Sequence, residues 1–197
     1  MSEALLAEPV RVLHVCTGNI CRSPMAERIM VAELSARFGP AAAQIDVSGA
    51  GTYGGHAGAP MNPPAARALG ELGLDAGDFR ATWLRESHVR QAHLVLTATA
   101  DHRAQVLALD QRALRRTFAL KELARLAAHA HPEDLPAGGP AERLAALVLL
   151  AVGLRALYPA QPRTLDDIGD PFGGPPEEFR QTAGEIRTAV RGILRPI

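Results

Sequence analysis

The sequence predicts an α/β fold in which a parallel sheet lies between helices on both of its faces. Three observations predict it. Short apolar runs with β-branched residues recur along the chain, a segment with helical spacing follows each of them, and turn residues such as Gly18 and Gly73 end the elements. This alternation favours parallel strands covered by helices. The length of 197 residues suits a single domain with one substantial core.

The expected elements follow one another from the N-terminus. Strands are expected at residues 12–15, 45–47, 93–97 and 116–119. Helices are expected at residues 25–38, 64–72, 101–109, 121–128, 141–158 and 177–194. The apolar run of the third strand predicts burial on both of its faces.

Residues 129–165 do not fit a minimal unit of this kind, and we interpret them as a helical insertion or elaboration. The segment passes through a PAGGP sequence at residues 136–140 and then forms one apolar helix. Its most apolar part, residues 144–154, is shorter than the roughly 20 residues that span a bilayer, so we expect a buried helix and no membrane insertion. The helix would either cap the core or offer a surface to a partner.

The charge balance limits the possible partners. The formal net charge is zero, with 21 basic and 21 acidic residues, so no overall positive field favours nucleic acid, and an anion must bind locally. The N-terminal MSEALLAEPVR lacks the features of a secretory signal, and a cytoplasmic location is expected. The histidines show no metal-binding spacing. The two cysteines lie five residues apart, which excludes a disulfide framework and points to a reactive thiol.

The most informative segment is Cys16–Pro24, with the sequence CTGNICRSP and the form Cys-x5-Arg-Ser. It follows the first strand, and ligands of open α/β sheets bind beyond the carboxyl ends of the strands. The backbone N–H groups of such a loop and the N-terminus of the next helix can cradle an oxyanion. The guanidinium of Arg22 can complete the cradle with a planar fork that matches two phosphoryl oxygens. The predicted phosphate-binding residues are Thr17, Gly18, Asn19, Ile20, Cys21, Arg22 and Ser23.

Cys16 is the predicted nucleophile. A helix N-terminus and a nearby cation stabilise a thiolate, so Cys16 should be ionised at neutral pH. Its attack on phosphorus would form a thiophosphoryl intermediate and divide hydrolysis into two displacements. Ser23 is placed to hydrogen-bond the sulfur and to help it leave.

The mechanism also needs an acid for the leaving oxygen and then a base for water. Asp170 is the best candidate, because it lies in an acid loop, residues 166–174, that is bounded by Gly and Pro and precedes the last helix. Asp166 and Asp167 are interpreted as solvated loop acids. The predicted catalytic residues are therefore Cys16, Arg22 and Asp170.

The segment Val12–Glu27, together with Asp170-Pro171-Phe172, resembles the low-molecular-weight protein tyrosine phosphatases of the bacterial type. The resemblance implies a four-stranded parallel sheet in a three-layer α/β/α arrangement, with no metal or organic cofactor. It also implies that Cys16 is the nucleophile, Arg22 the phosphate clamp and Asp170 the general acid and base.

The resemblance also implies roles for other loop residues. Asn19 would shape the loop, Ser23 would assist the leaving sulfur, and Cys21 would be a protective disulfide partner under oxidation. An inert apolar role for Cys21 stays equally open. Two positions depart from the family pattern: Gly49 stands where the family usually has a serine bonded to the loop asparagine, and Thr99 where many members carry a second aspartate.

The substrate groove departs from the family as well. Gly55 occupies the position of an aromatic wall. The groove should therefore be more open, with Tyr53 and Phe172 as its walls.

The predicted function is hydrolysis of phosphotyrosine in a phosphorylated protein substrate. The first alternative is a protein arginine phosphatase on the same scaffold. Members with that activity look to carry threonine after the loop asparagine, where this chain has Ile20, although Thr17, Phe172 and Gly173-Gly174 resemble that branch. An arsenate reductase would need further cysteines after Cys21, and the sequence has none. A catalytically weak module that binds phosphoprotein is a further alternative.

Overall fold

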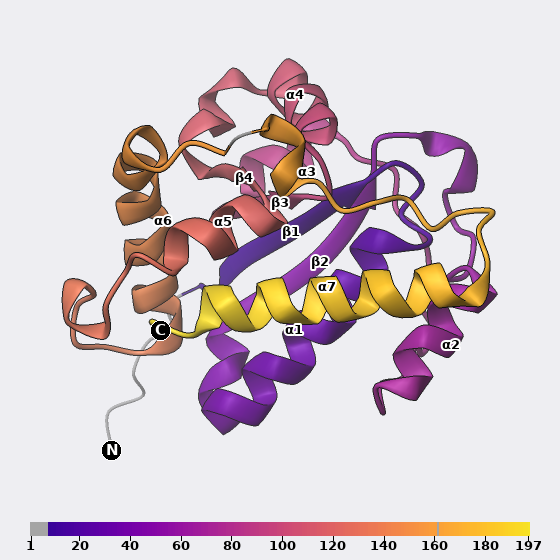
Figure 1. Cartoon of the computed structure of the whole chain (residues 1–197), viewed down its shortest axis with the longest axis horizontal. Coiled ribbons are helices and arrows are strands. Elements are labelled where there is room, and N and C mark those ends of the chain that lie inside the picture. Colours follow the sequence, from indigo (N-terminus) through magenta and orange to yellow (C-terminus); the bar gives the residue numbers. More distant parts are fainter. Residues whose placement is uncertain (1–7, 161) are drawn as a thin grey trace.

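The computed structural model describes residues 8–160 and 162–197. A parallel four-stranded sheet with the order β2-β1-β3-β4 forms its centre. The strands are β1 (Val10–Cys16), β2 (Ile45–Gly51), β3 (Leu94–Thr97) and β4 (Thr117–Ala119). Helices cover the sheet, and α1 and α7 lie side by side across it (Figure 1). The predicted α/β fold and its four parallel strands are confirmed.

The helices follow the strands as the sequence pattern indicates. They are α1 (Arg22–Phe38), α2 (Pro63–Glu71), α3 (Glu86–Gln91), α4 (Ala100–Leu109), α5 (Leu120–Ala127), α6 (Pro140–Leu157) and α7 (Pro176–Leu194). Short 3-10 helices occupy connections: η1 (Gly39–Gln44), η2 (Gly54–His56), η3 (Gln111–Arg116), η4 (Pro132–Asp134) and η5 (Arg163–Asp166). Helix α3 was not predicted, because its six residues carry a single buried apolar side chain, Val89.

Strand pairing places the end of β1 at the centre of the sheet. β1 pairs with β2 from Val10 opposite Ile45 to Cys16 opposite Gly51, and with β3 on its other edge. β2 therefore extends four residues beyond the predicted range, since pairing with β1 holds the glycine-rich end of this strand in spite of its low strand propensity. The chain connections run to opposite sides of β1. In doubly wound sheets, ligands bind beyond the carboxyl end of the strand at which this reversal occurs.

Alternating residues of β1 serve two apolar clusters, one on each face of the sheet. Val12 belongs to the larger cluster, which α1, α2, α5, α6 and α7 build, whereas Leu13 and Val15 belong to the smaller one with Val89 and Val106. All four residues of β3 are buried. The predicted burial of the third strand on both faces is therefore confirmed.

Helix α6 packs one face onto the larger cluster through Leu144, Leu147 and Ala151. Its opposite face is open to solvent, and Leu149 is 69% exposed. The expectation of a buried helix is thus correct for one face only. Packing of this kind agrees with the capping role considered for the helix.

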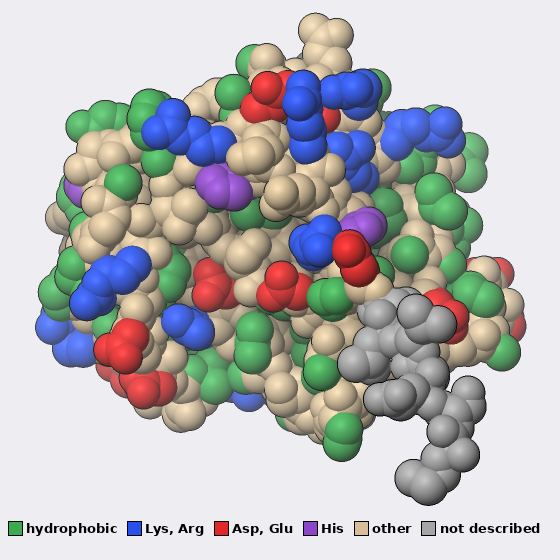
Figure 2. All heavy atoms as spheres, turned by 180° about the vertical axis from the view of Figure 1, so that it is seen from behind, with side chains coloured by type: hydrophobic (Ala, Val, Ile, Leu, Met, Phe, Trp, Pro, Cys, Tyr) green, Lys and Arg blue, Asp and Glu red, His purple; other side chains and the backbone are tan. Residues whose placement is uncertain are grey.

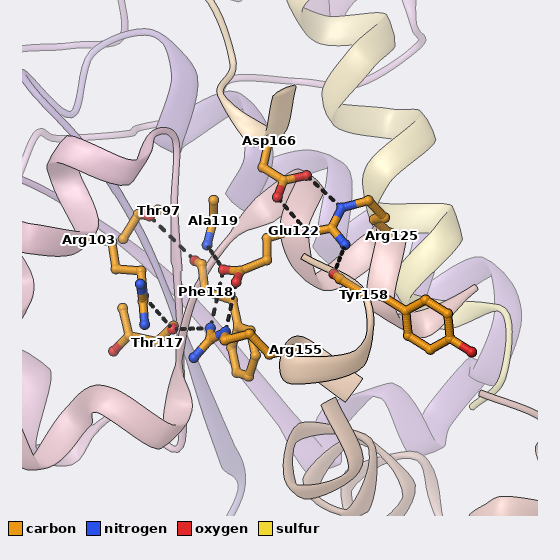
Figure 3. A network of polar contacts seen from close by, with 10 residues as sticks. All are labelled: Thr97, Arg103, Thr117, Phe118, Ala119, Glu122, Arg125, Arg155, Tyr158 and Asp166. Atoms are coloured by element: carbon orange, nitrogen blue, oxygen red, sulfur yellow. Dashed lines mark hydrogen bonds and ion pairs between the residues drawn. The ribbon is translucent and has the colours of Figure 1, made fainter. Parts of the chain in front are cut away.

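A polar network joins α6 to its neighbours (Figure 3). Arg155 of α6 donates to Glu122 of α5 at 2.7 Å and to the carbonyl of Thr117 at 2.9 Å. Arg125 of α5 forms a two-bond ion pair with Asp166 of η5. The network connects β4, α5, α6 and the start of the acid loop.

The surface carries charges of both signs. Basic and acidic side chains are interspersed over the face opposite to that of Figure 1 (Figure 2). Among the helices of the described residues, none has the length and apolarity that would take it across a membrane.

Candidate active site

The loop of residues 16–21 begins where β1 ends and leads directly into α1. Asn19 turns it with a positive φ of 52°, a conformation that Asn adopts more readily than most residues. Its side-chain Oδ1 accepts a hydrogen bond from the backbone N–H of Thr82 at 2.7 Å, and its Nδ2 donates to Ser23 Oγ at 2.8 Å. Asn19 is fully buried and thus fixes the turn from inside.

The carbonyl groups of the loop are bonded to backbone outside it. The carbonyls of Cys16, Thr17 and Ile20 accept from the N–H groups of residues 52, 53 and 62 at 2.8–2.9 Å. Within the described part of the chain, the backbone N–H groups of residues 17–21 donate no hydrogen bond. Unpaired N–H groups on successive residues of one loop form an anion-binding nest.

Cys16 and Ser23 lie together beneath the loop. The Sγ of Cys16 is 3.0 Å from Ser23 Oγ, and both side chains are 2% exposed. Because Asn19 donates to the Ser23 oxygen, the Ser23 proton is free to bond the sulfur. Such a bond stabilises negative charge on Cys16.

Arg22 links the loop to the acid loop. Its Nη2 donates to Asp170 Oδ2 at 2.7 Å and to Thr17 Oγ1 at 3.3 Å, and its Nη1 donates to the carbonyl of Ile168 at 3.2 Å. The Nε of this 95%-buried side chain has no partner among the described residues. A buried donor without a partner is costly, so the site is suited to an added acceptor.

A cavity of about 180 Å³ lies above Cys16. Its lining residues are Cys16, Thr17, Gly18, Ile20, Cys21, Arg22, His56, Asp170 and Phe172. Asp170 is at the mouth, with a side chain 47% exposed. The structure thus brings the predicted Cys16, Arg22 and Asp170 to one cavity, with Ile20, His56 and Phe172 as its less polar walls.

Tyr53 does not line this cavity. Its ring packs edge-on against His56, with ring centroids 5.5 Å apart. A Cβ added at Gly55 would lie 2.3 Å from the Tyr53 hydroxyl, so Tyr53 fills the space that a side chain at position 55 would need. The predicted pair of walls is therefore corrected: Phe172 lines the cavity, and His56 takes the place expected for Tyr53.

His56 was missed because its role depends on the turn of η2, which places the imidazole over Gly18. A Cβ added at Gly18 would lie 2.9 Å from His56 Cδ2. The only sequence signal is the spacing of His56 from Tyr53, which alone does not show which of the two rings faces the cavity.

Gly49 leaves room for the loop asparagine. A Cβ added there would lie 2.8 Å from Asn19 Nδ2 and 3.0 Å from Glu27 Oε2. Burial raises the pKa of the Glu27 carboxyl. Asn19 is held by Thr82 and Ser23, and not from position 49.

Thr99 reaches the site through a histidine. It precedes α4, and its Oγ1 accepts from the backbone N–H of His102 at 3.3 Å. The His102 ring lies between Thr99 Oγ1 and Thr17 Oγ1, at 2.7 and 2.9 Å. Sequence reasoning missed His102, because nothing local to α4 indicates a contact with residue 17.

Cys21 lies at the start of α1 and lines the cavity beside Cys16. Both are free thiols. Burial, and then negative charge on Cys16 and Asp170, raise the pKa of Cys21 to about 12. Cys21 is therefore a neutral thiol at pH 7, whereas a nucleophile would have to be a thiolate.

The start of the acid loop is anchored to other segments of the chain. Asp166 is 7% exposed and pairs with Arg125 at 2.7 Å. Asp167 Oδ1 accepts from the backbone N–H of Ala100 at 2.8 Å. The interpretation as a solvated acid was wrong for Asp166, which is buried against Arg125. Asp167 stays partly exposed, and its bond to Ala100 is a long-range contact that the sequence does not reveal.

A thiol, a guanidinium and a carboxyl around a nest of N–H groups define a phosphatase that uses a cysteine nucleophile. The model of the family described as "Low molecular weight phosphotyrosine protein phosphatase" matches residues 11–148. The chain belongs to this family, and the expectation drawn from its motifs is confirmed.

Relatives of known activity carry two different names. The chain is 31% identical to a "Low molecular weight protein-tyrosine-phosphatase" from Streptomyces coelicolor, over 95% of this chain and 93% of the relative. It is 29% identical to a "Protein-arginine-phosphatase" from Geobacillus stearothermophilus, over 92% of each chain.

Solved structures show the same division. An arginine phosphatase from Geobacillus stearothermophilus superposes with a TM-score of 0.67 at 25% identity, covering 95% of this chain and 92% of that one. A low-molecular-weight protein tyrosine phosphatase from T. tengcongensis superposes with a TM-score of 0.66 at 28% identity, covering 95% and 99%. The fold is thus common to both activities, and the substrate must be argued from the cavity.

Proposed function

We propose that this protein hydrolyses phosphotyrosine in protein substrates. The observation that carries the proposal is the composition of the cavity, which holds Cys16, Arg22 and Asp170 beside the apolar side chain of Ile20. A phosphoryl group fits the nest of N–H groups and the free Nε of Arg22. The phenyl ring would then lie between Ile20 and Phe172.

The reaction proceeds in two displacements. In the first, the Cys16 thiolate attacks phosphorus while Asp170 protonates the departing tyrosine oxygen. Arg22 and the loop N–H groups stabilise the charge on the equatorial oxygens. In the second, Asp170 accepts a proton from the attacking water, and Ser23 donates its hydrogen bond to the leaving sulfur.

Ile20 favours phosphotyrosine over phosphoarginine. Its side chain is 9% exposed and faces the cavity, where it can pack on a ring but cannot hydrogen-bond a guanidinium or a water beside it. Arginine phosphatase remains the second candidate, because a relative of that name matches at 29% identity and Thr17 resembles that branch. Family membership and the presence of Asp170 argue against a module that only binds.

Kinetics on two peptides test this proposal. Wild type, Cys16→Ser and Ile20→Thr are compared on a phosphotyrosine and a phosphoarginine peptide, with Ile20→Val as the matched apolar control. We expect phosphotyrosine turnover in wild type and Ile20→Val, none in Cys16→Ser, and a gain of phosphoarginine turnover in Ile20→Thr alone. A wild-type preference for phosphoarginine would support the second candidate, an arginine phosphatase, instead. Binding of both peptides without turnover would refute the enzymatic role.

The proposed location is the cytoplasm. The reaction needs Cys16 as a free thiol, and both cysteines are free. Reducing conditions of the cytoplasm maintain that state. The proposed partner is a phosphorylated protein.

A further inference from the structure

We propose that His102 is a positioning residue of the phosphate site, which orients the Thr17 hydroxyl so that it donates a hydrogen bond to a phosphoryl oxygen. The proposal rests on the proposed function only in that the cavity binds a phosphoryl group.

His102 bridges two threonines from separate segments. It lies in the first turn of α4, is 5% exposed, and bonds the hydroxyl oxygens of Thr17 and Thr99 with its two ring nitrogens. Thr17 lines the cavity, whereas Thr99 precedes α4. A ring held at both nitrogens cannot turn without losing a bond, so the position of the Thr17 oxygen is fixed from α4.

The ring is neutral at pH 7. Burial, with a further contribution from the Arg22 guanidinium, lowers the pKa of His102 to about 4. A neutral imidazole has one donor and one acceptor nitrogen. Two tautomers are therefore available, and they have different consequences for Thr17.

The hydrogen bonds of Thr99 favour the tautomer with the proton on Nε2. Thr99 Oγ1 already accepts from the backbone N–H of His102, which leaves its own proton for Nδ1 of the ring. The Nε2–H group then donates to Thr17 Oγ1, which also accepts from Arg22 Nη2 at 3.3 Å. With two donors on its oxygen, Thr17 directs its own proton toward the cavity.

The other tautomer would remove this donor. With the proton on Nδ1, the Thr17 hydroxyl would donate to Nε2 and would have no proton left for a ligand. A bound phosphoryl dianion therefore favours the Nε2–H form, and the preference for the tautomer and the affinity for phosphate are linked reciprocally. A merely structural bridge between α4 and the loop would show no such link.

The first experiment reads the tautomer directly. In full-length protein labelled with ¹⁵N-histidine, long-range ¹H–¹⁵N spectra assign the protonated ring nitrogen of His102 with and without inorganic phosphate. We expect the Nε2–H form in the phosphate complex. An Nδ1–H form in that complex would overturn the proposal, and because wild type is used, the result does not depend on a variant that folds.

The second experiment measures inhibition by inorganic phosphate in a double-mutant cycle. Thr17→Val and His102→Phe should each raise the phosphate inhibition constant about tenfold, as expected for one lost bond to a charged group. His102→Phe should add little in the Thr17→Val background, because both changes remove the same donor. Independent, multiplying effects would overturn the proposal. Phosphate binding does not involve the tyrosine ring, so a failure of phosphotyrosine turnover alone would refute the proposed function and not the role of His102.

Discussion

Acidification should destabilise this protein through a histidine in its central strand. His14 lies in β1, is 1% exposed, and has its Nε2 3.3 Å from the Sδ of Met30 on α1. Burial lowers the pKa of His14 to about 3. The unfolded chain binds a proton near the ordinary pKa of about 6.5, so between these two values the unfolded state is protonated and the folded state is not.

The sign and size of the effect follow from this difference. His14 costs no stability well above pH 6.5, and the free energy of unfolding falls by about 1.4 kcal/mol for each pH unit below that value. At pH 5 the loss is about 2 kcal/mol. His102, with a pKa lowered to about 4, adds a similar loss over the same range. Together the two histidines lower the free energy of unfolding by about 4 kcal/mol at pH 5. This loss is a large part of the 5–15 kcal/mol that is typical of folded domains.

Urea unfolding at constant ionic strength measures how the free energy of unfolding changes with pH. Measurements at about pH 7.5, 6 and 5 bracket the ordinary histidine pKa. In His14→Leu the slope should fall by about 1.4 kcal/mol per pH unit, whatever the variant does to stability at neutral pH. His131→Gln, which removes an imidazole at an exposed position, is the control for the loss of a histidine side chain as such. An unchanged slope in His14→Leu would refute the argument that His14 stays neutral in the folded protein.

Three further changes test the geometry of the site. Gly51→Ala would place a Cβ 2.7–2.8 Å from backbone atoms of the active-site loop, so it should lower kcat/KM about 100-fold. The control is Gly70→Ala on α2, which has open space around it and should leave kcat/KM unchanged. Arg125→Met leaves Asp166 buried without its partner and should lower the free energy of unfolding by about 3 kcal/mol in a urea titration. A loss below about 1 kcal/mol would show that the pair does not anchor the acid loop. Phe172→Ala should raise KM for a phosphotyrosine peptide about tenfold, with little change in KM for a small phosphomonoester without a ring. Equal changes in KM for both substrates would exclude Phe172 as a wall for the tyrosine ring.

The sequence predicted what local patterns determine. Four strands and the long helices could be located because apolar spacing and turn residues mark them. The Cys-x5-Arg-Ser pattern placed Cys16 at the end of the first strand and Arg22 at the start of the helix that follows. Asp170 could be predicted as the acid because a Gly- and Pro-bounded loop precedes α7. These signals lie within a few residues of the positions that they identify.

The remaining parts depend on contacts between distant segments. His102 meets Thr17 across 85 positions, and Asp166 meets Arg125 across 41, so neither pairing has a local signature. Tyr53 and His56 are neighbours in the chain, yet the short turn of η2 decides which one faces the cavity. Chemistry-bearing residues can therefore be identified from the sequence more readily than the residues that hold them.

Arg22 connects substrate binding with the placement of the acid. Its Nη2 bonds Asp170, while its Nε has no partner among the described residues. A phosphoryl dianion offers oxygens to the same guanidinium edge and competes with Asp170 for Nη2. Asp170 would then face the leaving oxygen, while the bond from Arg22 Nη1 to the Ile168 carbonyl keeps the acid loop in place. In the proposed reaction, the Arg22 side chain would thus bind the phosphoryl group and also free Asp170 to protonate the leaving oxygen.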